Sequence, residues 1–355
     1  MKSFHPDTES RFLQRCFDLA RLGAGKVSPN PTVGAVLVYE GRIIGEGFHQ
    51  QYGGAHAEVN AINAVSREDE ALIPKSTLYV SLEPCCVFGK TPPCTDLILE
   101  KGIPRVVVSN LDRSPAVNGL GLQKLREAGV EVHAGHLETE GAPHCDIRNT
   151  FASLGRPYIL LKYAQSEDGF LGPEGGSLWM TNEVSRRLVH KWRGETDAIL
   201  VGSNTLLADN PSLTNRHFYG KSPVRLVLDR PGTLPRTLRV FDEQAPTWVF
   251  TENPESYEGS QANVRIFSAP FGTNVLPYVL ECLAKERLTS LMVEGGGKLL
   301  KSLIAQSLWD EARVFKAPLF LEKGVEAPSL SGELKEVEEL LADRLFIWKN
   351  PEPLR

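Results

Sequence analysis

No run of apolar residues approaches the roughly 20 needed to cross a bilayer, and the amino-terminal residues lack the apolar stretch of a secretory signal. Six cysteines among 355 residues are too few for a disulfide framework. The net charge of −5 makes a nucleic acid an unexpected partner, whereas a single phosphate group remains compatible. We therefore expect a cytoplasmic protein that acts on a small molecule and binds neither membrane nor nucleic acid.

A length of 355 residues exceeds that of a typical single domain, so two domains with separate cores are expected. In both halves, apolar stretches of strand length alternate with stretches of helical periodicity, which predicts an α/β fold for each. The pattern is loosest between residues 135 and 157. We place the boundary there, with one domain over 1–150 and the other over 151–355.

The first half is expected to begin with a helix and a β-hairpin and to place helices on both faces of a mixed sheet. Its expected strands span 33–38, 42–48, 77–81, 105–109 and 130–134, and its helices span 9–22 and 120–128 and start near 56 and 94. In the second half, the expected strands span 158–164, 198–202, 224–228, 247–250, 290–294, 312–315 and 345–348, and the helices 182–192, 274–285 and 298–305. We interpret the acidic segment Glu333–Glu339 as a solvated helix and assign no function to the tail from Gly324.

Three potential metal ligands and one additional carboxylate form the most informative pattern of the sequence. They occur in the segments His56-Ala57-Glu58, Glu83-Pro84-Cys85 and Pro92-Pro93-Cys94. A catalytic zinc ion keeps three protein ligands and an open position for a water molecule, whose pKa it lowers toward about 7. His56, Cys85 and Cys94 can supply the ligands. Glu58 is then free to transfer protons between the water and a leaving amine, so the pattern predicts hydrolytic deamination.

Two other interpretations of these cysteines are open. Cys86 can act as the fourth ligand of a closed, structural zinc site, or Cys85 and Cys86 can be buried thiols of the core. We expect Cys85 to follow a strand and Cys94 to begin a helix, whose dipole favours a thiolate. Both sulfurs can therefore converge on His56.

The segments around these ligands have a distinctive spacing, because eight residues rather than two separate Cys85 from Cys94. The segments are Pro29-Asn30-Pro31-x-Val33-Gly34, Gly45-Glu46-Gly47-x-His49, His56-Ala57-Glu58-Val59, Leu82-Glu83-Pro84-Cys85 and Gly89-Lys90-Thr91-Pro92-Pro93-Cys94. Together they resemble the deaminase half of the bifunctional deaminase/reductase of riboflavin biosynthesis. The resemblance implies a cytidine-deaminase-like α/β/α fold that hydrolyses an amino group of a diaminopyrimidinone ribotide. It also implies that Asn30, His49 and Lys90 hold the base or the ribose phosphate.

Two features add to this comparison. Asp112 and Asn118-Gly119-x-Gly121 match the family's loop before the last helix of this half, although turn chemistry and capping explain them equally well. Where the family usually has Ser-His after the first cysteine, this chain has Cys86-Val87-Phe88. A polar contact with the substrate is expected to be missing there, while the zinc chemistry is expected to persist.

The second half contains a strand, a glycine turn and a helix start at Ser290–Glu294 and Gly295-Gly296-Gly297-Lys298. Backbone amides and a helix dipole at such a turn suit a phosphate of a bound nucleotide. The spacing differs from the Gly-x-Gly-x-x-Gly of a Rossmann site, and many glycine turns join strands to helices without binding a ligand.

Further motifs in this half resemble the reductase half of the same bifunctional family. They are Lys162-x-Ala164-x-Ser166-x-Asp168-Gly169, Ser177-x-Trp179-x-Thr181, Trp192-Arg193, Asp197-Ala198-Ile199-x-Val201-Gly202, Thr205, Asp209-Asn210-Pro211-x-Leu213-Thr214-x-Arg216 and Val293-Glu294-Gly295-Gly296. The resemblance implies a dihydrofolate-reductase-like α/β fold that uses NADPH. It assigns cofactor contacts to Ala164, Trp179, Thr205, Asp209, Gly295, Gly296 and Gly297. It assigns contacts with the ribose-phosphate substrate to Ser177, Arg193, Leu213, Arg216 and Glu294.

The planar guanidinium of arginine matches a phosphate group, which agrees with the roles of Arg193 and Arg216. Surface ion pairs are the alternative for both arginines, and core packing is the alternative for Trp179. For the proton that accompanies hydride transfer, Asp209 and a water molecule are the candidate donors.

Together these patterns predict a bifunctional enzyme, a zinc-dependent deaminase followed by an NADPH-dependent reductase, which we expect to form a homodimer. One alternative is an enzyme that retains a single activity because the change at Cys86-Val87-Phe88 impairs the first site. The other is a non-catalytic protein that binds zinc and a nucleotide, against which Glu58 argues.

Overall fold

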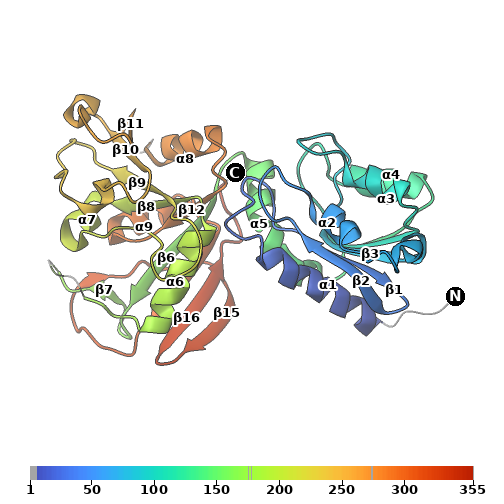
Figure 1. Cartoon of the computed structure of the whole chain (residues 1–355). Coiled ribbons are helices and arrows are strands. Elements are labelled where there is room, and N and C mark those ends of the chain that lie inside the picture. The colour runs from blue at the N-terminus through green and yellow to red at the C-terminus, as the bar shows by residue number, and fades with distance from the viewer. Residues whose placement is uncertain (1–5, 175, 177, 273–274, 355) are drawn as a thin grey trace. The chain divides into compact units, whose positions relative to one another are not determined.

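The structure is a computed structural model that describes residues 6–174, 176, 178–272 and 275–354, so Ser177 and Asn274 lie outside the described residues. The chain divides into two compact units, Met1–Gly155 and Arg156–Arg355 (Figure 1). The boundary expected after residue 150 falls inside a helix that ends at Leu154. No described helix combines the length and the apolar character that spanning a membrane requires.

The first unit contains a five-stranded mixed sheet in the order β2-β1-β3-β4-β5. Its strands are β1 (Gly34–Tyr39), β2 (Arg42–Phe48), β3 (Thr77–Leu82), β4 (Arg105–Asn110) and β5 (Glu131–Ala134). Strand β1 pairs antiparallel with both β2 and β3, whereas β3, β4 and β5 are parallel. The parallel strands bring the segments that follow them to one edge of the sheet.

Helices cover both faces of this sheet, which confirms the expected α/β/α layers. The helices are α1 (Pro6–Arg21), α2 (Ala57–Asn63), α3 (Cys94–Glu100), α4 (Leu120–Glu127), α5 (Glu138–Leu154) and the short 3₁₀ helix η1 (Glu70–Lys75). Alternate residues of β1 join different cores. Val36 belongs to a buried cluster with Phe17 of α1, and Leu37 belongs to another with Ile98 of α3 and Leu122 of α4.

The second unit contains a nine-stranded sheet in the order β11-β10-β9-β8-β12-β6-β13-β16-β15. Its strands are β6 (Tyr158–Gln165), β8 (Ala198–Gly202), β9 (Val224–Leu228), β10 (Thr247–Thr251), β11 (Val264–Ser268), β12 (Ser290–Val293), β13 (Glu311–Lys316), β15 (Glu333–Leu340) and β16 (Asp343–Lys349). The strands from β11 to β13 are parallel, and the β15–β16 hairpin adds antiparallel to β13. A separate ribbon pairs β7 (Phe170–Gly172) with β14 (Val325–Glu326).

Helices also cover both faces of this second sheet. They are α6 (Glu183–Glu195), α7 (Ser203–Asp209), α8 (Val275–Lys285), α9 (Gly297–Ala305) and the 3₁₀ helices η2 (Arg239–Phe241) and η3 (Pro254–Tyr257). Residues of α8 and α9 share one buried cluster with the sheet, and residues of α6 and α7 share the other. The unit is therefore an α/β fold, as predicted.

Two predictions about individual elements are wrong. The segment 135–157, for which no element is predicted, contains helix α5, because Gly141 and Pro143 interrupt the helical pattern of the sequence. The acidic segment Glu333–Glu339 belongs to strand β15 and not to a helix. Its acidic side chains are largely exposed, as suits a strand at the edge of the sheet. Elements β7, β11, β14 and α7 are also absent from the prediction.

Candidate functional site

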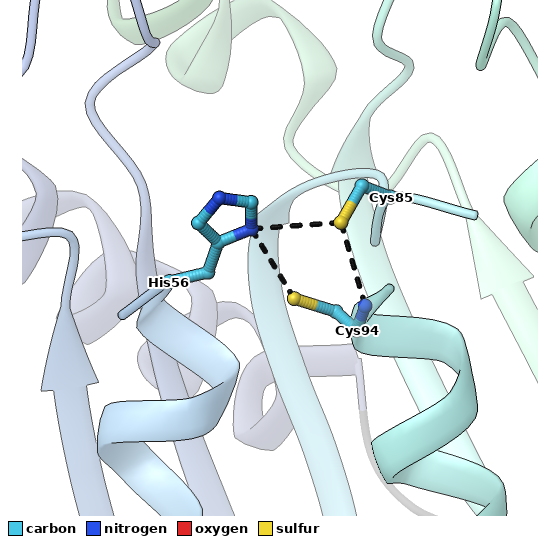
Figure 2. Close-up of side chains that lie close together, drawn as sticks. All are labelled: His56, Cys85 and Cys94. Atoms are coloured by element: carbon cyan, nitrogen blue, oxygen red, sulfur yellow. Dashed lines mark hydrogen bonds between the residues drawn. The ribbon is translucent and has the colours of Figure 1, made fainter. Parts of the chain in front are cut away.

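Three side chains of the first unit converge beyond the end of strand β3. His56 lies immediately before α2, Cys85 follows β3, and Cys94 is the first residue of α3. Their ligand atoms all lie within 4.8 Å of one another. The Nδ1 atom of His56 is 3.5 Å from the Cys85 sulfur and 3.3 Å from the Cys94 sulfur (Figure 2). One imidazole nitrogen and two sulfurs at these separations fit a zinc ion with an open coordination position.

The surroundings favour thiolate ligands. The backbone N–H of Cys94 donates to the Cys85 sulfur over 3.4 Å. The pKa of Cys85 is lowered because hydrogen bonds with the Cys94 thiol, the His56 ring and this N–H stabilise its thiolate. The hydrogen bond with Cys85, and then burial, raise the pKa of the Cys94 thiol in turn. Binding of a divalent cation releases the proton of such a thiol.

Glu58 lies in the first turn of α2, two residues after His56. Its side chain is buried, and the burial raises its pKa to about 7, with the Cys85 sulfur adding to the rise and His56 opposing it. A carboxyl group that titrates near neutrality can both accept and donate a proton. The position and the pKa of Glu58 therefore suit a general acid–base catalyst.

Cys86 lies apart from the ligand cluster. Its thiol is 3.8 Å from the carbonyl oxygen of Ala116, and the cluster of potential ligands found among the described residues does not include it. This arrangement disfavours a closed zinc site with four protein ligands. It also disfavours an interpretation of Cys85 as a simple core thiol, because its sulfur lies next to His56.

The predicted substrate residues Asn30 and His49 lie beside the cluster. The amide nitrogen of Asn30 is 3.1 Å from Nε2 of His49, whose Nδ1 is 2.9 Å from the carbonyl oxygen of Ala55. The rings of His49 and His56 meet edge to face, with their centroids 5.2 Å apart. The predicted substrate residue Lys90 places its ammonium group 4.0 Å from the ring centroid of Tyr52.

Glu83 has a structural role that sequence reasoning missed. Its carboxylate accepts hydrogen bonds from the backbone N–H groups of Gly119, at 2.9 Å, and Gly121, at 3.0 Å. A Cβ atom at Gly121 would lie only 2.2 Å from the carbonyl oxygen of Pro84. The glycine loop is thus fastened to the segment that carries Cys85, which favours the turn and capping interpretation. The position of Glu83 directly before Pro84-Cys85 is the sequence signal that could have indicated this contact.

Asp112 also makes local turn contacts. Its carboxylate accepts hydrogen bonds from the backbone N–H of Ser114, at 2.8 Å, and from the hydroxyl of the same residue, at 2.5 Å. Turn chemistry accounts for this side chain as well.

In the second unit, Arg193 and Glu294 are paired with each other. Two guanidinium nitrogens donate to the two carboxylate oxygens over 2.6 and 2.8 Å, and Lys162 adds a contact of 3.5 Å to Glu294. Burial alone would raise the pKa of Glu294, but Arg193 and Lys162 outweigh it and hold the pKa at about 2. The pair is buried, unlike the surface ion pair considered for Arg193. Sequence reasoning missed Lys162 as its third member.

Arg216 has a different environment from Arg193. One of its terminal nitrogens donates to the Thr214 hydroxyl over 3.1 Å, and no carboxylate forms an ion pair with it among the described residues. Burial and the nearby cations Arg193 and Arg239 lower its pKa, which shows that positive charge gathers here. Leu213 is buried in the core with a φ of 55°, so any contact it makes with a ligand would involve its backbone.

The glycine turn predicted for the cofactor connects β12 to α9. Gly295 and Gly296 have φ values of 106° and 69°, a region that favours glycine. A Cβ atom at Gly296 would be 3.2 Å from the hydroxyl oxygen of Thr205, so the structure brings Thr205 next to the turn. Thr205 belongs to α7, which follows β8. The parallel strands β8 and β12 therefore place the segments that follow them, α7 and the glycine turn, next to each other.

The remaining predicted cofactor residues differ in how far their side chains are exposed to solvent. Trp179 is 74% exposed, with the guanidinium carbon of Arg186 5.4 Å from its ring centroid, so it does not pack in the core. Ala164 is half-buried near the end of β6, and Asp209 is exposed at the end of α7. Ser177, a predicted substrate residue, lies outside the described residues.

Two family models match the two units. One, described as the RibD C-terminal domain, matches residues 157–342. The other, described as the cytidine and deoxycytidylate deaminase zinc-binding region, matches residues 6–110. The second match contains the cluster of His56, Cys85 and Cys94.

Relatives match almost the whole chain. The riboflavin biosynthesis protein RibD of Aquifex aeolicus is 39% identical over 343 residues, which are 95% of this chain and 94% of that protein. RibD of Bacillus amyloliquefaciens is 40% identical over 94% of this chain and 91% of its own. A solved Thermotoga maritima structure, described as a diaminohydroxyphosphoribosylaminopyrimidine deaminase/5-amino-6-(5-phosphoribosylamino)uracil reductase, has a TM-score of 0.89 at 37% identity and covers 98% of this chain and 100% of that one. The chain therefore belongs to the RibD family of riboflavin biosynthesis and is a bifunctional enzyme with a zinc-binding deaminase domain and a reductase domain.

Proposed function

We propose that the first unit deaminates 2,5-diamino-6-ribosylamino-4(3H)-pyrimidinone 5′-phosphate and that the second reduces the ribosyl chain of the product to a ribityl chain. The description of the Thermotoga maritima relative supports this choice of substrate. The observation that carries the proposal is the convergence of His56, Cys85 and Cys94 near the buried Glu58. We place the boundary between the two domains at Gly155, where the two compact units meet in the sequence.

We assign zinc binding to His56, Cys85 and Cys94. A zinc ion bound there supplies Lewis acidity, which lowers the pKa of a water molecule toward about 7. The backbone N–H of Cys94, which donates to the Cys85 sulfur, would offset part of the negative charge of that ligand. Cys86 lies at the Ala116 carbonyl, apart from the cluster, and is not assigned as a ligand.

We assign the proton transfers of the deamination to Glu58. As a carboxylate it accepts a proton from the water molecule, and as a carboxylic acid it delivers the proton to the amino group that leaves. Its burial makes both forms accessible near neutral pH. Asn30, His49 and Lys90 are assigned to the base or the ribose phosphate, and the contact between the His49 and His56 rings supports the position of the first two.

We assign the substrate phosphate of the reductase to Arg216, because its guanidinium has no carboxylate partner among the described residues. Arg193 and Glu294 are assigned to the sugar of the same substrate, together with the backbone of Leu213 and with Ser177. A buried, charged pair with fixed geometry can orient a polar sugar without moving. Asp209 or a water molecule supplies the proton that completes the reduction.

A reductase of this family uses a nicotinamide cofactor, and we propose that the cofactor is NADPH. It supplies a hydride to the open-chain form of the sugar. The residues assigned to its binding are Ala164, Trp179, Thr205, Asp209 and Gly295–Gly297. The positive φ values at Gly295 and Gly296 and the contact of the turn with Thr205 support a site that lets a ligand approach the backbone.

We also propose that the enzyme is a cytoplasmic homodimer. Exposed apolar side chains on and after the edge strand β15, namely Leu334, Val337 and Leu341, support an association of subunits. The cysteines are all free thiols, which fits a reducing compartment.

Substitution of Glu58 by Gln tests the deaminase assignment. We expect Glu58→Gln to lower the deamination rate by about 10²–10⁴-fold, because an amide cannot carry the proton. Zinc content, measured by elemental analysis, should stay at one ion per chain, since the ligands are unchanged. Reduction of the deaminated substrate should proceed at the unaltered rate.

The matched control is Glu68→Gln, because Glu68 is an exposed glutamate of the same unit. This variant should deaminate at the normal rate. A Glu58→Gln enzyme with near-normal deamination would refute the proton-transfer role, and purified enzyme without zinc would refute the metal site.

A further inference from the structure

Helix α6 holds the segment 214–216 at two points. The Nη1 atom of Arg193 donates to the carbonyl oxygen of Thr214 over 3.1 Å. Three residues earlier on α6, the Nδ1 atom of His190 accepts a hydrogen bond from the backbone N–H of Arg216 over 3.0 Å. Positions three apart lie on the same face of a helix, so both side chains reach the same segment. The backbone on both sides of Asn215 is thereby fixed to α6.

The hydrogen bond from Arg216 requires a neutral His190 ring with an unprotonated Nδ1. The ring is buried, and the charged or titratable groups that act on it are Arg193, Arg216, His217 and Glu294. The ring of His217 meets it edge to face, with the centroids 4.6 Å apart. Burial first, and then the neighbouring cations, lower the pKa of His190 to about 4. The acceptor is therefore available throughout the physiological pH range.

The consequence concerns the direction of the Arg216 side chain. Its backbone is held by His190, and its guanidinium donates to the Thr214 hydroxyl over 3.1 Å. The carbonyl group of the same Thr214 is held by Arg193. Three hydrogen bonds thus restrict an exposed arginine that has no ion-pair partner among the described residues, which reduces the entropy lost when it binds an anion.

We propose that His190 is a positioning residue of the reductase, whose Nδ1 atom orders Arg216 for binding of the substrate phosphate. The inference rests on the assignment of Arg216 to that phosphate. His190 contacts the backbone of Arg216 and not the reacting atoms. Its contribution should therefore appear in the affinity for the phosphorylated substrate and not in the chemical step.

The test uses His190→Asn and His190→Gln in the full-length enzyme. Asparagine can place its Oδ1 atom where Nδ1 of the imidazole lies, whereas glutamine places its oxygen near the position of Nε2. We expect His190→Gln to raise the reductase KM for the phosphorylated substrate about tenfold with kcat nearly unchanged, since one hydrogen bond is lost. His190→Asn should stay within about threefold of the wild-type KM. The affinity for NADPH, measured by fluorescence titration, should be the same in both variants and shows that the unit is folded.

Two further measurements separate positioning from general support of the fold. With the dephosphorylated substrate, His190→Gln should have the same KM as the wild-type enzyme. Arg216→Ala should raise the KM for the phosphorylated substrate by more than His190→Gln does. Addition of His190→Gln to Arg216→Ala should raise it no further, because both act on one contact.

The outcomes distinguish the two assignments. If Arg216→Ala leaves the KM unchanged, the phosphate assignment fails and the inference fails with it. If Arg216→Ala raises the KM and His190→Gln does not, the inference about His190 alone is overturned. An equal effect of His190→Gln on the dephosphorylated substrate, or weaker NADPH binding, would also overturn it, because the histidine would then support the fold generally.

Discussion

Two buried carboxyl groups respond to their surroundings in opposite ways. For Glu58 burial dominates and raises the pKa to about 7, so the group can exchange a proton near neutrality. For Glu294 the cations Arg193 and Lys162 outweigh burial and hold the pKa at about 2. The first group is suited to proton transfer, and the second stays charged and fixes its neighbours.

We expect Glu294→Gln to destabilise the second unit by about 3 kcal/mol at pH 7, because it leaves the buried Arg193 without its charge partner. The folded-state pKa of Glu294 lies below the ordinary value of 4.5, so the carboxylate contributes its full stability above that value and loses it as the pH falls toward 2. The difference in free energy of unfolding between Glu294→Gln and the wild-type protein should therefore shrink as the pH falls below 4.5. Urea unfolding followed by tryptophan fluorescence measures it, because all five tryptophans belong to the second unit.

Glu183→Gln is the matched control. Glu183 forms an exposed ion pair with Arg187 one turn along α6, so its loss should change stability by no more than about 0.5 kcal/mol. If the difference in free energy of unfolding between Glu294→Gln and wild type stays constant as the pH is lowered, the low pKa assigned to Glu294 is contradicted.

At the scale of elements, periodicity predicts those whose patterns are uninterrupted. Helix α1 and the β1–β2 hairpin appear close to their predicted positions, because apolar residues recur there with the period of a helix or a strand. Helix α5 escapes prediction because Gly141 lies where it approaches β4. A Cβ atom there would be 2.1 Å from Oδ1 of Asn110 and 2.5 Å from Oγ of Ser109. A tertiary contact, and not helix propensity, accounts for this glycine.

Gly141→Ala should therefore destabilise the first unit by about 1–3 kcal/mol, although alanine is the better helix former. The added methyl group must displace Asn110 and Ser109, whose side chains donate to the carbonyl oxygens of Glu138 and Leu137 at the start of α5. The temperature of half-inactivation of the deaminase measures the effect.

Glu140→Ala serves as the neighbouring control, since Glu140 is exposed on the same helix and should tolerate the change. The reductase should keep its own inactivation temperature in both variants. A Gly141→Ala enzyme as stable as wild type would show that α5 is free to move away from β4.

At the scale of the whole molecule, each unit has its own sheet, its own buried clusters and its own candidate site. The cluster of His56, Cys85 and Cys94 lies within the first unit, and the arginine and glycine segments lie within the second. The two activities should therefore respond separately to loss of the metal.

We expect a strong chelator to abolish deamination while reduction of the deaminated substrate continues at more than about half its original rate, because no described residue of the second unit contributes a ligand to the cluster. Added zinc should restore deamination. The two rates, assayed on one chelated sample, provide the measurement. Parallel loss of both activities would contradict the independence of the units.

The sequence by itself determined the three side chains that converge in the structure, the buried carboxyl group of Glu58 proposed for proton transfer, and the α/β class, because these depend on residue chemistry and short-range spacing. The tertiary structure decided which partners the charged and polar side chains have. Arg193 pairs with Glu294, which lies 101 positions away in the chain, and Glu83 accepts a hydrogen bond from Gly121, which lies 38 positions away. Such contacts arise when parallel strands bring distant segments to one edge of a sheet, and no local pattern of residues encodes them.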